Sequence, residues 1–506
     1  MAVRPQAELI GALSVESDLV SFAVFSTTTG QEVATSSKRL PMLTTGSSSS
    51  SSSSDCRQPA AAWQPGWVEQ EPAKVWAAVN EVVANVSNEM CRSGLPVTYI
   101  KALGVTNEPG TVLAWNADTG GVLCNAVHRT DARAADGPDA AVEWLTRHSE
   151  PVKRAGHKCR FGTWDTWTLW MLTSGQVYTT DVTNASQTRL MALPGPEWDE
   201  SVCRDRNICV ASLPPIRAPS PSTLYAVVTV GELIGLSVYS VMSRPNAVLC
   251  GHGCDSAGQA SVTMDERGVT VMCVTGRSPV TSSALTAVVA CVTADHKANS
   301  AMLYALQATS QVNMAVASLV SNLALFKSTA ECMNVYCTAG PSTPAYMATE
   351  EGVSSAPYGR ADAGGIMCGI TGDTSKEHLA RAAVDSMCFT VADAFNASQS
   401  DSRKSVHTAF MDGSYSEYDD VLQQQADVCG IRVIKNHRRD MAVYGVAVAA
   451  GLAVNIKFGN HRCDPDVYDP KSSAEQRAQW QKQWGKCVQR SYGWNRIGGR
   501  LTDDFS

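Results

Sequence analysis

The stretch PAKVWAAVNEVVANV, Pro72–Val86, carries the pattern that decides the fold class. Its apolar residues recur at helical spacing and predict a helix with one buried face: Val75, Trp76, Val79, Val82 and Val83. Strand-like segments flank it, two before and two after: Leu9–Leu13, Val20–Phe25, Tyr99–Val105 and Thr111–Trp115. Because strands and helices alternate, this part of the chain is expected to form an α/β sheet.

A second alternation begins near Tyr239, with strands expected at Ala287–Val292 and Asn334–Thr338. The clearest helix is Lys376–Ala397, where an apolar stripe at helical spacing predicts core packing. Thr374 and Glu377 have the spacing of a capping box at its start.

The C-terminal part of the chain predicts two more helices. Val443–Val454 is apolar and rich in Ala and Gly, and it is too short to cross about 30 Å of hydrocarbon, so a buried helix is expected there. A last helix is expected at Ala474–Gln489, with Ser472 and Glu475 as its capping box.

Composition excludes several classes of protein. The formal net charge of the 506 residues is -7 and no basic stripe is present, which argues against a nucleic-acid partner. The 17 cysteines are scattered without CxxC pairs, and no secretory signal is recognised, so reduced thiols in a cytoplasmic protein are expected. His252 with Cys254, and His461 with Cys463, lack the further ligands that zinc requires, so no metal site is predicted.

Five strings occur in one order along almost the whole chain. They are Pro65–Trp76, Gly104–Val127, Phe161–Ser186 (FGTWDTWTLWMLTSGQVYTTDVTNAS), Ala356–Phe389, and Gln423–Val433 with Tyr444–Val454. Together they resemble the FGGY carbohydrate-kinase family, and within it the glycerol kinases most. The resemblance implies two actin-like (ribonuclease-H-like) α/β domains with a cleft between them.

The same resemblance implies an organisation and an activity. Residues 1–238 would form the polyol-side domain, interrupted near 45–56 by a disordered loop around the serine run Ser47–Ser54. Residues 239–506 would form the nucleotide-side domain. The family's activity is ATP-dependent phosphorylation of glycerol to glycerol 3-phosphate, so ATP and Mg²⁺ are the implied ligands, and homo-oligomers are common among its members.

Several positions that carry this chemistry in the family hold other residues here. The family's catalytic base, an Asp, aligns with Arg244, and a guanidinium cannot accept a proton. In the first phosphate loop a glycine is replaced by Glu16. Asp18 nearby could hold magnesium, but an ordinary turn is the preferred interpretation.

The polyol side and the nucleotide side differ in how many of the family's motif residues they keep. The family's Arg-Glu polyol clamp aligns with Pro109 and Gly110, so no substrate-binding residue is expected, and the segment with the stacking tyrosine and the first FGGY signature is deleted. The second phosphate loop aligns with Asp265–Gly268 and keeps Gly268 alone. On the adenine side Asp412, Gly413 and Ser414 partly match the family motif, so nucleotide binding is the function expected to survive.

Two hypotheses follow. In the first, the chain is a pseudokinase with a binding or regulatory role, because its scaffold strings are kept and its ligand-facing strings are replaced. In the second, it is an active kinase of glycerol or another polyol or carbohydrate that uses altered residues. A third possibility is a changed substrate, with Arg244 and Arg267 holding an anion. A decaying duplicate would have a similar sequence.

Overall fold

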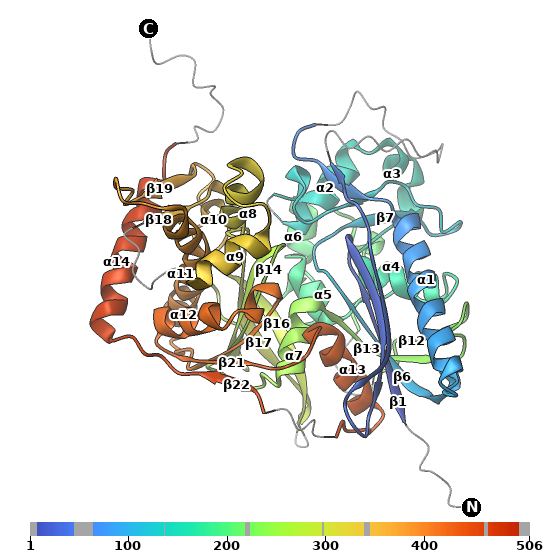
Figure 1. The fold of residues 1–506 in the computed structure, drawn as a ribbon. Helices are drawn as coiled ribbons and strands as arrows, with labels where there is room; N and C mark the ends of the chain where they lie inside the picture. The colour runs from blue at the N-terminus through green and yellow to red at the C-terminus, as the bar shows by residue number, and fades with distance from the viewer. Residues whose placement is uncertain are drawn as a thin grey trace, which may run out of the picture. The chain divides into compact units, whose positions relative to one another are not determined.

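The computed structural model describes residues 8–44, 64–135, 137–217, 223–295, 298–338, 345–459 and 464–494. The serine run, His461 and Cys463 lie outside these ranges. Contacts divide the chain into two compact units (Figure 1). Unit 1 contains residues 1–253, 289–303 and 440–462, and unit 2 contains residues 254–288, 304–439 and 463–506. The sequence-based boundary after residue 238 stays a prediction.

A six-stranded sheet, in the order β12-β13-β6-β1-β2-β3, forms the centre of unit 1. Its strands are β1 (Leu9–Val15), β2 (Leu19–Ser26), β3 (Glu32–Arg39), β6 (Ile100–Asn107), β12 (Ala226–Val227) and β13 (Ser237–Ser243). β6 runs parallel to both β1 and β13, whereas β2 and β3 continue the sheet antiparallel. The strands expected at Leu9–Leu13 and Val20–Phe25 are therefore confirmed, and they pair as an antiparallel hairpin.

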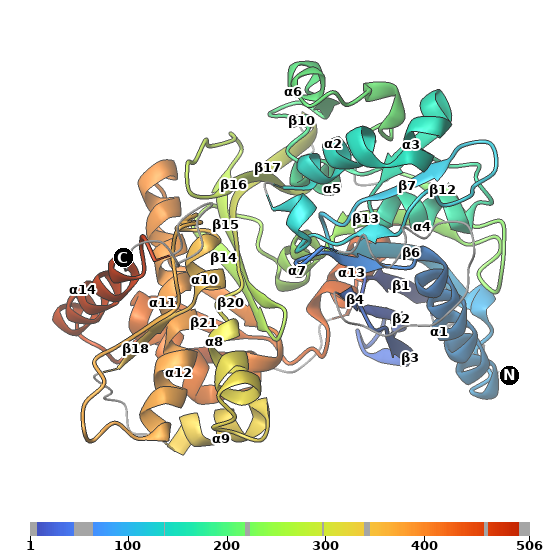
Figure 2. The same ribbon diagram turned by 90° about the horizontal axis from the view of Figure 1, so that it is seen from above.

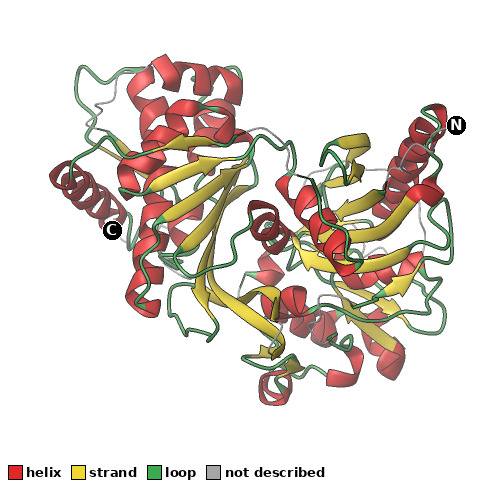
Figure 3. Ribbon diagram, turned by 90° about the horizontal axis from the view of Figure 1, so that it is seen from below, coloured by secondary structure: helices red, strands yellow, loops and turns green. Residues whose placement is uncertain are grey.

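Helices cover both faces of this sheet (Figure 3) because its central strands are apolar on both sides. Leu9 and Leu13 of β1 pack with α1 (Pro72–Arg92) and α4 (Trp164–Leu172). The alternate residues Ile10 and Ala12 pack with α7 (Arg244–His252) and α13 (Met441–Ala453). The helices predicted at Pro72–Val86 and at Val443–Val454 are thus confirmed as buried helices of unit 1.

A seven-stranded sheet, in the order β16-β17-β15-β14-β20-β21-β22, forms the centre of unit 2, except that residues 289–303 of its strands β16 and β17 are counted with unit 1. Its strands are β14 (Gln259–Asp265), β15 (Gly268–Gly276), β16 (Thr286–Asp295), β17 (Ala298–Ser310), β20 (Thr408–Asp412), β21 (Arg432–Lys435) and β22 (Asp466–Tyr468). The run β17-β15-β14-β20-β21 has the order and the strand directions of β3-β2-β1-β6-β13 in unit 1. Both units therefore repeat one α/β topology, as the sequence predicted.

The remaining elements complete the two units (Figures 1 and 2). The strands are β4 (Leu43–Thr44), β5 (Val68–Gln70), β7 (Leu113–Asn116), β8 (Ala126–Val127), β9 (Cys159–Gly162), β10 (Met191–Ala192), β11 (Glu197–Trp198), β18 (Tyr346–Ala348) and β19 (Ile366–Cys368). The helices are α2 (Pro138–His148), α3 (Glu150–Ala155), α5 (Val182–Gln187), α6 (Glu200–Asp205), α8 (Met314–Ala317), α9 (Thr329–Thr338), α10 (Glu350–Ser354), α11 (Lys376–Ser402), α12 (Asp419–Cys429) and α14 (Ala474–Arg490).

The expected strand at Asn334–Thr338 is wrong, because these residues form the last turns of α9. Cys332, Met333 and Tyr336 are buried at helical rather than alternating spacing. The strand expected at Ala287–Val292 and the helices expected at Lys376–Ala397 and Ala474–Gln489 are confirmed as parts of β16, α11 and α14.

Both predicted capping boxes are wrong by one residue. α11 is capped by Ser375 with His378, and α14 by Ser473 with Gln476. In each case two neighbouring hydroxyl residues had suitable spacing, and only the backbone geometry decides which one is the cap. Within the described part of the chain, no helix combines the length and hydropathy that crossing a membrane requires.

Very close packing joins α13 to α7 within unit 1. A Cβ built on Gly445 would lie 1.8 Å from the backbone oxygen of Ala247, so no other residue type fits at this contact. The start of α13 meets α7 near the other end of that helix, where a Cβ built on Gly251 would lie 2.6 Å from the Met441 oxygen, and the long side chain of Arg244, the first helical residue of α7, reaches Asp440.

Gly445→Ala should destabilise the protein, by about 1–3 kcal/mol or more, because the added methyl must push two buried helices apart. Gly485→Ala is the matched control, since Gly485 lies inside α14 and an added Cβ meets no atom within 4 Å. That control should leave stability unchanged or raise it by up to about 1 kcal/mol. Thermal and urea melting curves measure both effects, and equal behaviour of the two variants would contradict the packing described.

Candidate functional site

Three neighbouring parallel strands of unit 1 end at the same level. In the register of the sheet Val15 pairs with Asn107, and Asn107 pairs with Ser243. The next residue after each strand is Glu16, Glu108 and Arg244, respectively. Ligand sites of open α/β sheets form at the carboxyl ends of such strands, so these side chains mark the candidate site of unit 1.

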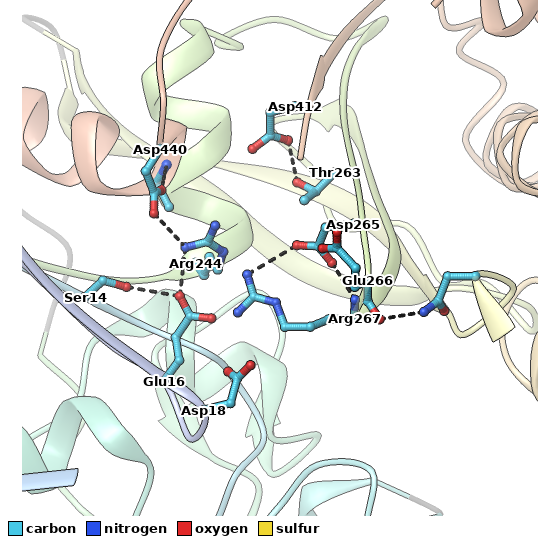
Figure 4. Close-up of polar contacts among 12 residues, drawn as sticks. Ser14, Glu16, Asp18, Arg244, Thr263, Asp265, Glu266, Arg267, Asp412 and Asp440 are labelled. Carbon is cyan, nitrogen blue, oxygen red and sulfur yellow. Dashed lines mark hydrogen bonds and ion pairs between the residues drawn. The ribbon is translucent and has the colours of Figure 1, made fainter. Parts of the chain in front are cut away.

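Arg244 is held between two carboxylates (Figure 4). Its Nη1 lies 2.8 Å from Oε1 of Glu16 and 3.5 Å from Oδ2 of Asp440, the N-cap residue of α13. Glu16 is 1% exposed and also accepts a hydrogen bond of 3.2 Å from the Ser14 hydroxyl. A guanidinium in this ion-paired setting stays protonated, so it can attract an anion but cannot accept a proton.

Glu108 lies beside this pair in a dense set of hydrogen bonds. The hydroxyls of Ser17 and Thr111 donate to its carboxylate, and Nε2 of His128 lies 3.5 Å from Oε1. Burial is the largest single influence and would raise the pKa of Glu108, but His128, Arg129 and Ser17 together lower this pKa to about 2. The pKa of Asp18 is raised instead, by burial and by the charge of Glu108.

Glu16, Asp18 and Glu108 are, among the described residues, the one group of three potential metal ligands, with ligand atoms within 4.8 Å of one another. Carboxylate oxygens suit Mg²⁺ by donor type. However, Arg244 already brings positive charge to Glu16, and the His128 ring lies 3.5 Å from Glu108. An ion would have to displace Arg244 from Glu16, and the absence of metal ligands stays a prediction.

Pro109 and Gly110, the positions predicted from the resemblance to correspond to the polyol clamp, have no side chain that could hold a hydroxyl. Gly110 adopts a φ of +88°, and a Cβ there would lie 3.3 Å from side-chain carbons of Arg129 and Pro138. Pro109 precedes it and has no backbone N–H to donate. This part of the site therefore offers no donor or acceptor side chain at the two positions.

In unit 2 the predicted phosphate loop Asp265–Gly268 is a tight turn between β14 and β15. Arg267 pairs with Asp265 at 3.2 Å, and Nδ2 of Asn313 donates to the Glu266 carbonyl at 2.7 Å (Figure 4). Gly268 has a φ of +133°, and a Cβ there would lie 2.5 Å from the Ser310 oxygen. The turn itself therefore requires this glycine.

Asp412, Gly413 and Ser414 follow one another at the carboxyl end of β20. The Thr263 hydroxyl donates to Oδ1 of Asp412 at 2.6 Å. Gly413 has a φ of +92°, and a Cβ would lie 2.2 Å from the Met264 oxygen, so β14 forces a glycine here. The buried Ser414 hydroxyl has no hydrogen-bond partner among the residues that the structure describes, which leaves it available to a ligand.

A buried amide and carboxylate network supports the site in unit 1. Asn107 and Asn184 exchange amide hydrogen bonds of 2.9 and 3.1 Å. Asp181 caps α5 by accepting from the backbone N–H groups of Thr183 and Asn184. Burial, and then the charge of Asp165, raises the pKa of Asp181 to about 7.

The structure brings Glu16 and Arg244 together and adds Asp18, Glu108 and Asp440, while Gly268 and Asp412–Ser414 lie in unit 2. Sequence reasoning did not connect Glu16 with Arg244 and missed Glu108 and Asp440. The signal that was available is positional: Glu16, Glu108 and Arg244 each come directly after a strand of the sheet. His252, considered as a metal ligand, is buried, and burial lowers its pKa to about 3.

Comparison with known proteins gives one consistent result. The C-terminal domain model of the "FGGY family of carbohydrate kinases" matches residues 270–454, and the N-terminal domain model matches residues 34–141 and 137–239. A glycerol kinase of Nocardia farcinica is 30% identical over 471 residues, which cover 85% of this chain and 92% of that protein. A glycerol kinase of Acidiphilium cryptum is 31% identical, with 85% and 92% covered.

Solved structures agree on the fold. The crystal structure of Plasmodium falciparum glycerol kinase with ADP matches with a TM-score of 0.79 at 21% identity, covering 96% of this chain and 98% of that one. Gluconate kinase from Lactobacillus acidophilus matches with a TM-score of 0.76 at 16% identity, covering 96% and 97%. The predicted pair of actin-like α/β domains is thereby confirmed, and the cleft between them stays a prediction.

Arg244→Met should lower the free energy of unfolding by about 3–5 kcal/mol, because it leaves the buried Glu16 without its cation. Combining it with Glu16→Gln should recover much of that loss, since no uncompensated charge remains. Arg267→Met is the matched control: its pair with Asp265 is more exposed and should cost at most about 1 kcal/mol. Urea melting of the variants tests the pairing, and equal losses for both arginine variants would refute it.

The raised pKa of Asp181 predicts a pH dependence opposite to ordinary acid denaturation. The folded protein keeps this proton up to about pH 7, whereas the unfolded chain releases it near pH 4, so this group's contribution to stability falls as pH rises between these values. Asp181→Asn should therefore make stability fall less between pH 5 and pH 8. Asp199→Asn is the control, because Asp199 also caps a helix but its pKa is lowered and it does not titrate in this window. An unchanged slope for Asp181→Asn would contradict the shift.

Proposed function

The chain belongs to the FGGY family of carbohydrate kinases, and we propose that it is a glycerol-kinase-like member whose transfer of phosphate from ATP to glycerol is strongly impaired or lost. One observation carries the proposal: Arg244 is ion-paired with the buried Glu16. By the sequence resemblance, Arg244 corresponds to the family's base and Glu16 to a glycine of the phosphate loop. The two replaced residues neutralise each other.

Phosphoryl transfer to a hydroxyl needs a group that accepts the proton, donors that hold the phosphates, and a cation that neutralises their charge. At the base position, Arg244 accepts no proton. At the phosphate loop, the Glu16 carboxylate replaces a glycine that would let backbone N–H groups approach phosphate. Loss of a general base alone typically costs about 10²–10⁴-fold in rate.

The polyol side adds a second defect that is independent of the base. Pro109 and Gly110 present no side-chain group to hold the hydroxyls of glycerol. Without such a clamp the attacking oxygen is not kept within about 3–3.5 Å of the phosphorus, and positioning accounts for much of the acceleration in this chemistry. Restoring a carboxylate at position 244 would therefore still leave the glycerol hydroxyl without a group that positions it.

Nucleotide binding is the activity that we propose to be retained, in unit 2. The Ser414 hydroxyl, which has no partner among the described residues, supports this proposal, whereas Gly268 and Gly413 are already required by their own sheet. The Plasmodium relative was crystallised with ADP. ATP or ADP is the ligand that we expect at Gly268 and Asp412–Ser414, with Mg²⁺ coming with the phosphates, and the protein would then act by binding rather than by turnover.

A coupled assay with ATP and glycerol should give no turnover above background for the wild-type chain. Arg244→Asp should give none either and should melt at a lower temperature, because the introduced carboxylate would face Glu16 and Asp440. The double variant Glu16→Gly with Arg244→Asp removes most of that repulsion and should regain stability, yet stay inactive because Pro109 and Gly110 remain.

Thermal shift measures binding without turnover. ATP at many times its dissociation constant should raise the melting temperature, since a ligand that binds only the folded state stabilises it by RT ln(1 + [L]/Kd). Ser414→Ala should weaken this shift, whereas Ser416→Ala, whose hydroxyl is satisfied by the Gly413 carbonyl, should affect it less. Robust ATP-dependent phosphorylation of glycerol by the wild type or by Arg244→Asp would overturn the proposal.

A further inference from the structure

Two cysteines far apart in sequence meet where α14 packs on a hairpin of unit 2. The hairpin consists of β18 and β19, in which Cys368 pairs with Tyr346, and one end of α14 packs against it (Figure 1). Cys487, in the last turns of α14, belongs to the buried core of unit 2 on which Cys368 packs, and Cys368 is close enough to raise the pKa of the Cys487 thiol. Both cysteines are free thiols.

The attachment of α14 keeps this contact in place. Nε1 of Trp484 donates to Oδ2 of Asp393 at 3.0 Å, and the Tyr358 hydroxyl donates to the same oxygen at 2.6 Å. The ring of Trp484 stacks on Phe389, with centroids 5.5 Å apart. Because Trp484 is three residues before Cys487, these bonds fix the end of the helix that carries the thiol.

The two thiols differ in access to solvent. Cys368 is partly exposed at the end of its strand, whereas Cys487 is 1% exposed. Burial raises the pKa of the Cys487 thiol, and neighbouring Cys368 raises it further. An oxidant from solution therefore reaches Cys368 first, and Cys487 is placed to react second.

We propose that Cys368 and Cys487 form a reversible disulfide by exchange with a low-molecular-weight disulfide such as oxidised glutathione. The Cys368 thiolate attacks one sulfur of that disulfide, which forms a mixed disulfide and releases one glutathione thiolate. Cys487 then loses its proton to solvent and attacks the Cys368 sulfur, which releases the second glutathione. Two protein thiols are oxidised and one glutathione disulfide is reduced, so the reaction balances.

The disulfide would fasten the C-terminal helix to the β18–β19 hairpin. It closes a long loop of the chain, and a bond that closes a long loop restricts the unfolded state strongly. The proposed disulfide does not involve Arg244, Glu16 or the residues at Asp412–Ser414. Its test is therefore independent of the test of the proposed function.

The full chain, first reduced, is incubated with oxidised and reduced glutathione at several ratios and then alkylated and digested. We expect a linked peptide pair joining Cys368 to Cys487, with loss of two hydrogens from the intact mass, and complete reversal by dithiothreitol. The melting temperature of the linked protein should exceed that of the reduced protein. Stable glutathione on Cys368 without the link, or no reaction at either thiol, would overturn the proposal.

Variants distinguish the role of Cys368, which attacks glutathione disulfide first, from that of Cys487, which closes the protein disulfide. Cys487→Ala should stop the reaction at the mixed disulfide on Cys368, and Cys368→Ser should abolish both products while changing only a partly exposed position. Cys91→Ser is the matched control, because Cys91 is an exposed thiol of unit 1 and its loss should leave the linked pair unchanged. A link that persists in Cys368→Ser would assign the chemistry to another cysteine and refute the pairing.

Discussion

The parallel register of β1, β6 and β13 is the constraint on which the site of unit 1 depends. Parallel strands carry their carboxyl ends to one edge, so whatever residues follow those ends must meet. In this chain the residues are two acids and an arginine, and the buried Glu16 is compatible with folding because Arg244 lies 2.8 Å away. A buried carboxylate without such a partner would cost several kcal/mol. The fold therefore makes the two replacements interdependent.

The glycines of unit 2 show why a partial motif is weak evidence of chemistry. The sequence resemblance predicts that Gly268 and Gly413 belong to nucleotide-binding loops, yet each is already required by backbone atoms of its own sheet. Either residue would be retained by selection on packing alone. Ser414 differs from these glycines, because its buried hydroxyl has no hydrogen-bond partner among the described residues. Packing within the protein therefore does not explain why this side chain is polar.

Much of the fold could be predicted from the sequence, because it depends on patterns that are local. Helical spacing placed α11 and α14, and alternation placed the N-terminal hairpin and β16. The segment Asn334–Thr338 misled because it is short and apolar, and only its burial beside α11 shows that it is helical. The sequence identified Arg244 and Glu16 separately, but their contact depends on the register of the strands. Asp440 contacts Arg244 because α13 packs against the sheet, and no local sequence pattern predicts that packing.

Unit 1 is assembled from segments that are far apart in the sequence, and this separation affects the order in which the parts of unit 1 can form. Its sheet is complete once residue 243 has been made, but one apolar face, which includes Ile10, Ala12 and Ala102, is covered by α13, residues Met441–Ala453. A ribosome that adds about 5–20 residues per second needs roughly 10–40 s to reach that helix after the sheet has emerged. During this interval the apolar face of the sheet is exposed and can contact other nascent chains. The protein is therefore expected to depend on chaperones that bind emerging chains.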